Sequence, residues 1–160
     1  MGREVRLVPA DWEHPRDEHG KYKPLFNDDY VTVAWEWMHE AKLWSEQKHP
    51  EQDSKYNFYW EWSDMPPEEN LYRPAWIEDN RTHFQMYETT SEGTPISPVM
   101  ETKEELAHWL ADNNANAFGG MTATYEEWLT TIERGWAVSL VGEAGKGLVS
   151  GVEGMRKIES

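Results

Sequence analysis

The sequence predicts an α+β fold, in which a small, mostly antiparallel sheet is covered by about three helices in a single domain. Short stretches of alternating apolar and polar residues indicate strands, and longer stretches with apolar residues three and four positions apart indicate helices. A chain of 160 residues with ten Trp, seven Tyr and four Phe can bury a substantial core. We expect residues 1–145 to form the domain and residues 146–160 to form a flexible, Gly-rich tail.

Four stretches carry the alternation that is typical of strands. They are Glu4–Val8, Tyr56–Trp62, Thr82–Tyr87 and Trp136–Val141. In Thr82–Tyr87, Phe84 and Met86 share one face, and the residues between them share the other. In Tyr56–Trp62, every second residue is aromatic, which is a strong strand signal. The order of the strands in the sheet stays open.

The longest predicted helix begins at Asn27 or Asp28 and ends at about Gln47. One face collects apolar residues at helical spacing, namely Tyr30, Val33, Ala34, Trp37, Met38, Ala41 and Trp44. Trp35 lies off this face. Because large aromatic side chains usually pack, the sequence favours burial of Trp35, with exposure for a partner as the alternative.

Two shorter helices are predicted from their capping signals. Thr102 to Glu105 and Thr124 to Glu127 each have the spacing of a capping box, and Gly135 marks the end of the second helix. Earlier in the chain, Asp17 and Gly20 indicate a tight turn. Between strand and helix, residues 88–98 are rich in hydroxyl groups, Gly and Pro, and are expected to form an ordered loop.

The charge of the chain is strongly negative and unevenly distributed. Thirty acidic and fifteen basic residues give a net charge of −15, of which residues 28–92 carry −10. Such a field repels nucleic acid and anionic membranes and attracts basic partners, although a solvated acidic surface is the favoured explanation. The absence of Cys excludes disulfide and thiolate chemistry, and no apolar run is long enough to span a bilayer.

Signals for chemistry are weak along the chain. Ser91, with His83 or His108 as a base, could serve a small hydrolase, but Ser and Thr in such loops more often bond their own backbone. Glu36 and His39 share a helix side without a full set of metal ligands, and residues 142–147 lack the spacing of a phosphate loop. We therefore expect no catalytic residue, no metal and no cofactor.

The acidic, aromatic middle of the chain is the predicted partner-binding site. Aromatic anchors among acids are typical of an interface with a basic protein, and core packing is the alternative reading. The predicted binding residues are Trp60, Trp62, Glu68, Glu69, Trp76, Glu78 and Asp79. Stacking on single-stranded nucleic acid would need a basic groove, which this charge pattern does not provide.

Two segments carry a family resemblance. The first is Trp-Glu-His-Pro-Arg-Asp at residues 12–17, continuing to Leu25, and the second is residues 81–99 with the helix after them. Together they resemble an uncharacterised family of small acidic proteins of tailed phages and prophages. The resemblance implies a phage origin and carries over no catalytic residues.

By analogy with phage inhibitors of CRISPR complexes and other defences, the expected function is that of a non-enzymatic accessory protein. It would act in the cytoplasm of the bacterial host, where it would bind and inhibit a basic, nucleic-acid-handling host protein. A small hydrolase that uses the Ser91 loop is one alternative. A minor virion or assembly component, possible as a homo-oligomer, is the other.

Overall fold

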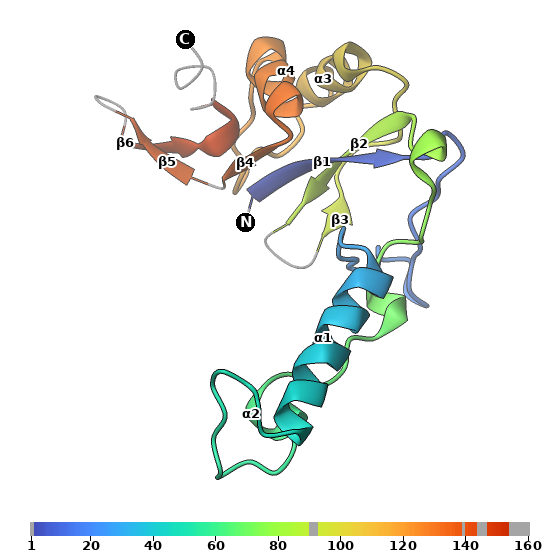
Figure 1. Cartoon of the computed structure of the whole chain (residues 1–160). Helices are drawn as coiled ribbons and strands as arrows, with labels where there is room; N and C mark the ends of the chain where they lie inside the picture. Colours follow the sequence, from blue (N-terminus) through green and yellow to red (C-terminus); the bar gives the residue numbers. More distant parts are fainter. Residues whose placement is uncertain (1, 90–92, 139, 144–146, 154–160) are drawn as a thin grey trace. The chain divides into compact units, whose positions relative to one another are not determined.

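A computed structural model describes residues 2–89, 93–138, 140–143 and 147–153, and it confirms the α+β class. In this described part, four antiparallel strands form an open sheet in the order β3-β2-β1-β4 (Figure 1). The strands are β1 (Gly2–Val8), β2 (His83–Glu88), β3 (Thr94–Pro95) and β4 (Trp136–Val138). The predicted strands at the N-terminus and in the centre of the chain are therefore confirmed within two residues.

The chain divides into two compact units. The sheet unit contains Met1–Pro24 and Trp76–Ser160, and the helix unit contains Leu25–Ala75. The chain thus leaves the sheet unit after β1 and returns to it before β2. These two strands are hydrogen-bonded neighbours over six residue pairs, from Arg3 with Glu88 to Val8 with His83.

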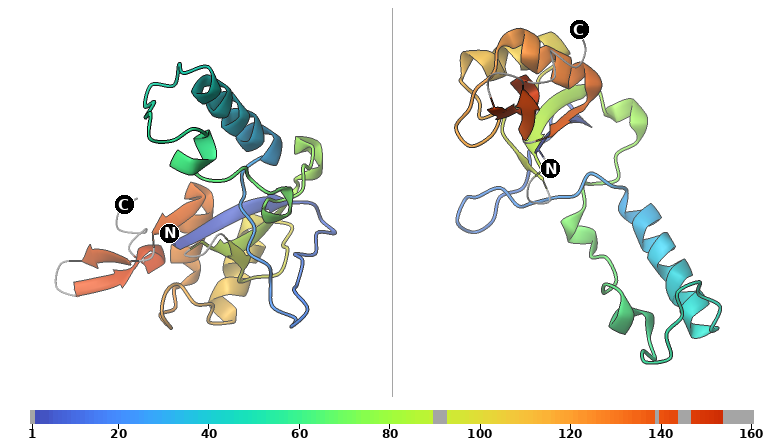
Figure 2. Two further views of the ribbon diagram at one scale, coloured as in Figure 1. Left: turned by 90° about the horizontal axis from the view of Figure 1, so that it is seen from below. Right: turned by 90° about the vertical axis from the view of Figure 1, so that its left-hand side faces the viewer.

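Two helices cover one face of the sheet. They are α3 (Lys103–Asp112) and α4 (Tyr125–Arg134), which lie side by side in both sets of views (Figure 1; Figure 2). Between sheet and helices lies the core cluster, which includes Met86, Leu106, Leu110, Trp128, Ile132 and Ala137. Because side chains alternate along β2, Met86 enters this core while Gln85 and Tyr87 are buried on the opposite face.

Thr102 and Thr124 cap their helices as predicted, and of the two predicted capping boxes the second is formed in full. Thr102 accepts a hydrogen bond from the Glu105 amide at 3.0 Å, and Thr124 and Glu127 form a reciprocal capping box. Gly135 ends α4 with a left-handed φ of 101°. In the N-terminal segment, the Gly20 amide donates to the Asp17 carbonyl at 3.0 Å, which confirms the tight turn.

The helix unit is built around α1 (Tyr30–Ser45), which is capped by Asp29 rather than by Asn27 or Asp28. Met38, which was expected on the apolar face with Trp37 and Trp44, and Trp35, whose burial was expected, are both 65% exposed.

The predicted strand Tyr56–Trp62 is wrong, because Tyr59–Trp62 forms the short helix α2. A helical turn puts Tyr59 and Trp62 on one side, and both rings contact Trp44 of α1. A strand would have placed them on opposite faces. The alternation of aromatic residues therefore indicated the two-residue period of a strand, whereas Tyr59–Trp62 is helical.

The last strands also differ from the prediction. Trp136–Val141 does not form one strand, since β4 ends at Val138 and β5 (Leu140–Glu143) pairs instead with β6 (Gly147–Ser150). The sequence predicts a flexible tail over residues 146–160, whereas residues 147–150 form β6 and Val152 is fully buried in the core of the sheet unit. Residues 146 and 154–160 of the predicted tail lie outside the described residues. Its apolar side chain is what fixes this segment.

Gly151 provides a test of that docking. A Cβ atom at this position would lie 1.8 Å from the carbonyl oxygen of Val138. Gly151→Ala is therefore expected to displace Val152 from the core, lowering the free energy of unfolding in urea by about 2 kcal/mol. Glu153→Ala is the control at a half-exposed neighbouring position, and an unchanged Gly151→Ala protein would mean that the segment is not docked as described.

Candidate functional site

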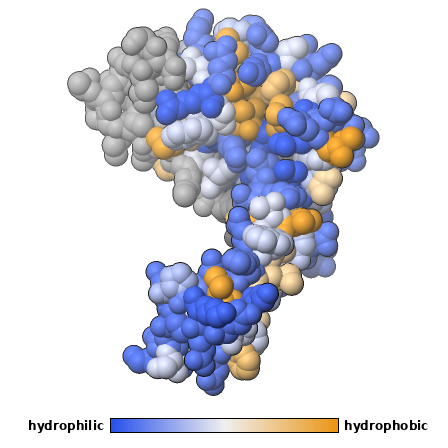
Figure 3. Space-filling model, in the orientation of Figure 1, coloured by the Kyte–Doolittle hydropathy of each residue, from blue (hydrophilic) through white to orange (hydrophobic). Residues whose placement is uncertain are grey.

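The helix unit exposes more large apolar side chains than it buries. Among the described residues, twelve large hydrophobic side chains are exposed, and eight of them belong to this unit. They are Val31, Trp35, Met38, Tyr56, Phe58, Trp60, Met65 and Leu71. Only Leu25 and Trp44 of the unit are fully buried hydrophobic residues. In Figure 3, orange hydrophobic residues are set within a hydrophilic surface. Exposed apolar surface with a polar surround is typical of a binding surface.

The same unit carries a dense negative charge. Its 51 residues contain eleven acidic and four basic side chains, a net charge of −7, whereas the other 109 residues carry −8. Carboxylates beside exposed aromatic rings complement a partner that presents cations next to apolar residues. The charge and the exposed apolar surface thus coincide in one unit.

Four of the predicted binding residues lie in the helix unit. Trp60 is 42% exposed and stacks on Phe58 with ring centroids 4.5 Å apart. Trp62 is half-buried and stacks on Trp44. Its main role is therefore packing within the helix unit. The predicted acids Glu68 and Glu69 are both exposed at the start of the short 3-10 helix η1 (Glu69–Leu71).

The other three predicted residues lie in the sheet unit. Trp76 is half-buried and packs edge-to-face on Trp12, with ring centroids 4.7 Å apart. Glu78 and Asp79 are exposed in the 3-10 helix η2 (Glu78–Asn80). The structure therefore divides the predicted set between two units.

A cluster of aromatic rings holds the helix unit together. The imidazole of His49 lies 5.4 Å from the Trp44 ring, 5.7 Å from Tyr59 and 5.5 Å from Trp62. His49 Nε2 also pairs with a carboxylate oxygen of Glu40. The indole nitrogen of Trp44 donates to the Tyr56 carbonyl at 3.2 Å, so its polar atom is satisfied in the interior. This cluster fixes α2 against α1 and so supports the exposed surface of the unit.

A buried polar network lies on the face of the sheet opposite α3 and α4. The Tyr87 hydroxyl accepts a hydrogen bond from the Trp12 indole at 3.1 Å and lies 2.9 Å from His14 Nδ1 and 3.1 Å from Gln85 Oε1. The Gln85 amide in turn donates to the Ser97 carbonyl at 2.8 Å. The network thus joins residues 12–14 to residues 85–97, the two segments that carry the family resemblance. Sequence reasoning missed it, since its members are more than 70 positions apart.

The hydrogen-bond partners of His14 and Tyr87 indicate which of their atoms carry hydrogen. His14 Nε2 lies 2.5 Å from the Lys23 carbonyl oxygen, so this nitrogen carries hydrogen. Burial lowers the pKa of His14, and the nearby Arg6 and Arg16 lower it further against the opposing hydrogen bond to Lys23. Neutral His14 therefore accepts at Nδ1, and the single hydroxyl proton of Tyr87 is shared between His14 and Gln85. Burial also raises the pKa of Tyr87, which keeps that proton in place.

The lowered pKa of His14 makes stability depend on pH. The unfolded chain takes up this proton near pH 6.5, whereas the folded protein takes it up only at lower pH. The stabilising contribution is present above pH 6.5 and is lost as the pH falls below it. We expect a lower free energy of unfolding at about pH 5.5 than at about pH 7.5. In urea titrations His14→Gln should weaken this dependence, and an unchanged dependence in this variant would contradict the expectation.

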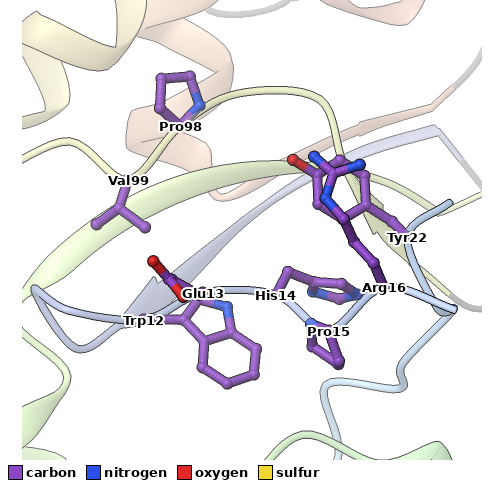
Figure 4. A pocket seen from close by; sticks show the side chains of 8 residues that line it. All are labelled: Trp12, Glu13, His14, Pro15, Arg16, Tyr22, Pro98 and Val99. Carbon is purple, nitrogen blue, oxygen red and sulfur yellow. The ribbon is translucent and has the colours of Figure 1, made fainter. Parts of the chain in front are cut away.

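A shallow hollow of about 630 Å³ lies beside the network. Figure 4 shows its lining, which comprises Trp12, Glu13, His14, Pro15, Arg16, Tyr22, Pro98 and Val99. The Arg16 guanidinium lies 3.8 Å from the centre of the Tyr22 ring and donates to the Gly20 carbonyl at 2.7 Å. Arg16 and His14 of this lining are thus held by contacts of their own, and none of these contacts defines a ligand.

Of the residues considered for catalysis, the structure describes His83 and His108, and each has a separate contact. Ser91 lies outside the described residues. His83 Nδ1 lies 2.9 Å from the Thr82 hydroxyl, and His108 stacks on Tyr125. Hydrolase activity therefore stays a prediction. Within the ranges that the structure describes, no three His, Asp or Glu side chains converge on a possible metal site.

The fold defines an α+β protein with an open antiparallel sheet and an inserted helical unit that carries an acidic, partly apolar surface. Comparison of the chain with known protein families, curated proteins and solved structures gives no match. In the part of the chain that is described, no helix combines the length and apolar character needed to cross a membrane.

Proposed function

We propose that this chain is a phage-encoded, non-enzymatic accessory protein that binds a basic, nucleic-acid-handling protein of the bacterial host in the host cytoplasm. Binding through the acidic, aromatic surface of the helix unit would inhibit that protein by covering its basic surface. The resemblance of residues 12–17 and 81–99 to small acidic phage proteins supports the origin.

The observation that carries this proposal is the coincidence of exposed apolar residues and negative charge in one unit. Eight large hydrophobic side chains are exposed there, among residues that carry a net charge of −7. Apolar anchors such as Trp60 supply affinity when a partner removes them from water. Carboxylates such as Glu68 and Glu69 accelerate the encounter with a basic partner and disfavour acidic ones.

Affinity capture from bacterial lysate tests the proposal. The tagged chain is expected to retain one near-stoichiometric, nucleic-acid-handling protein at low salt and less of it at moderate salt, because salt screens the charges. The captured protein, purified, should lose its activity on nucleic acid when the chain is added. Failure to capture any such protein at either salt concentration would contradict the proposal.

Charge reversal at the predicted acids should weaken this binding. Glu68→Lys/Glu69→Lys is expected to reduce the association rate by about tenfold or more at low salt, and less at high salt. The matched control is Glu101→Lys/Glu133→Lys, which makes the same change in net charge at exposed positions of the sheet unit. Surface plasmon resonance against the purified partner measures both. Equal rates for the two variants would mean that the helix unit is not the binding surface.

A further inference from the structure

The outer side of α1 carries an apolar row that the packing of the helix unit does not use. Val31, Trp35 and Met38 are each 65% exposed, and exposed Lys42 continues the row. Their spacings of four, three and four residues place all of them on one side of the helix. The alternation of three and four is the spacing of the seam by which two helices pack in a coiled coil. The row therefore has the pattern of a helix-packing surface.

The opposite side of α1 is already packed within the helix unit. Trp44 is 1% exposed and contacts three other rings. The Trp37 indole donates to the Asp64 carbonyl at 2.9 Å, and Glu40 pairs with His49. The helix thus has one face for its own unit and a second apolar face in solvent, whereas a surface helix normally carries only the first.

Trp35 is held in position at the centre of the row. Its indole stacks on the imidazole of His39, one turn along, with ring centroids 5.3 Å apart and planes only 2° from parallel. A side chain that is already ordered loses little conformational freedom on binding. Tryptophan is also among the residues most enriched as binding anchors. The geometry therefore suits an anchor for a second helix.

The two ends of the row carry charges of opposite sign. At the N-terminal end, the Asp29 carboxylate accepts hydrogen bonds from the amide and the hydroxyl of exposed Thr32, the residue after Val31. Exposed Asp28 adds a second carboxylate at this end of the helix. At the other end, the row finishes at Lys42, in the last turn of α1. The row therefore runs from an acidic end to a basic end.

The other exposed charges near the row do not alter this polarity. Glu36 follows Trp35 by one position and is therefore turned by about 100° from it around the helix. Glu46 is the C-cap of α1, and its carboxylate lies 3.9 Å from the ammonium of Lys48, so the two charges offset each other.

The polarity of the row indicates which partner fits it. A uniformly basic helix would bring cations against Lys42, and a uniformly acidic helix would bring carboxylates against Asp29. A second copy of α1 in antiparallel orientation brings Lys42 of each copy to the acidic end of the other, whereas a parallel copy brings like charges together. Antiparallel pairing also sets Trp35 opposite Met38, and a thioether packs favourably against an aromatic ring. The row is therefore complementary to itself.

We propose that two copies of this chain pair through α1 in antiparallel orientation, related by a twofold axis that passes between Trp35 and Met38. The apolar row of each copy covers that of the other, and Lys42 lies beside the acidic end of the opposite helix. This inference goes beyond the proposed function and does not depend on it, because Glu68 and Glu69 lie outside α1.

Sedimentation equilibrium of the full chain tests the pairing. Three apolar side chains per copy cover less than the about 800 Å² per partner of a standard interface, so we expect a dimer with a Kd on the order of 100 μM. The measurement is made in about 0.15 M salt, which screens the repulsion between two chains of net charge −15. A chain that is still monomeric at a concentration tenfold above this Kd would overturn the inference. Oligomers larger than a dimer would overturn it too, because a twofold pair is closed.

Substitutions in the row should weaken the dimer. Trp35→Ala/Met38→Ala is expected to raise the Kd by about tenfold or more, through loss of the apolar contacts. Lys42→Glu is expected to raise it by about fivefold or more, because it sets carboxylates against carboxylates. The matched controls Trp136→Ala and Lys55→Glu change an exposed Trp and an exposed Lys elsewhere and should leave the Kd within about twofold. A dimer that neither variant of the row weakens would use another surface and would overturn the inference.

Disulfide formation tests the orientation, since the chain contains no Cys of its own. Oxidation of an equal mixture of Val31→Cys and Lys42→Cys chains is expected to give mainly the mixed disulfide. Antiparallel pairing brings these two positions together and keeps identical positions about 16 Å apart along the helix, which is too far for a disulfide. Disulfides between identical variants would show a parallel pair, and a random distribution would show non-specific collision. Either result would overturn the proposed arrangement.

The outcomes separate this inference from the proposed function. A chain that stays monomeric but captures the host protein, and loses it in Glu68→Lys/Glu69→Lys, would leave the proposed function standing and show that the pairing of α1 is wrong. A chain that forms the mixed disulfide but captures no host protein would leave the pairing standing and show that the proposed function is wrong. If neither the dimer nor the host protein is found, both are wrong.

Discussion

Trp44→Ala is expected to destabilise the helix unit by about 3–5 kcal/mol, the cost of removing a fully buried aromatic side chain. Trp44 is the largest fully buried side chain in the unit and contacts three other rings, those of His49, Tyr59 and Trp62. The unit buries little else, so a cavity at this place removes most of its interior. The expected result is local unfolding of α1 and α2.

Amide hydrogen exchange distinguishes local from global effects. In Trp44→Ala the amides of α1 should exchange nearly as fast as those of an unfolded chain, whereas the amides of β1 and β2 should keep their protection. Trp35→Ala is the matched control, because it removes an exposed Trp from the same helix and should change stability by less than about 0.5 kcal/mol. Preserved protection of α1 in Trp44→Ala would contradict the packing described here.

Tyr87→Phe is expected to lower the free energy of unfolding by about 3 kcal/mol, although it removes only one oxygen atom. The loss deprives the Trp12 indole of its acceptor and leaves His14 Nδ1 and Gln85 Oε1 without the shared proton. These groups are buried or half-buried, so water cannot fully replace the missing partner. The apolar part of the ring is unchanged, which isolates the effect of the hydroxyl.

Urea unfolding of Tyr87→Phe and Tyr125→Phe provides the comparison. The Tyr125 ring stacks on His108 on the helical side of the sheet unit, and its replacement should cost less than about 0.5 kcal/mol. A small effect at both positions would mean that the polar network contributes little to stability. The signal of the Trp12 indole should move in Tyr87→Phe if its hydrogen bond is lost.

Local signals in the sequence predicted the parts of the fold that depend on local chemistry. Thr102, Thr124 and Gly135 begin and end helices because capping groups act within one turn of the backbone. The alternation in residues 82–87 predicted a central strand, and β2 indeed pairs with a strand on each side. It is buried on both faces because α3 and α4 cover one face and Trp12 and His14 contact Tyr87 on the other. In each of these cases the information lies within a few residues.

The sequence could not predict features that depend on distant residues. Tyr59 and Trp62 adopt a helical turn because Trp44, fifteen and more positions earlier, receives both rings. His14 and Tyr87 meet because β1 and β2 pair, and no local pattern indicates that meeting. Trp35 looked like a core residue because a large aromatic usually is one, but the inner face of α1 was already filled.

The point at which the helix unit joins the sheet unit has a consequence for how such a protein can diversify. Residues 25–75 are inserted between two strands whose register is fixed by their own hydrogen bonds and by the core beneath them. Changes within the insertion therefore leave the pairing of β1 with β2 intact. Residues 25–75 could therefore be replaced as a whole in the course of evolution, while β1 and β2 still pair and the sheet unit still folds.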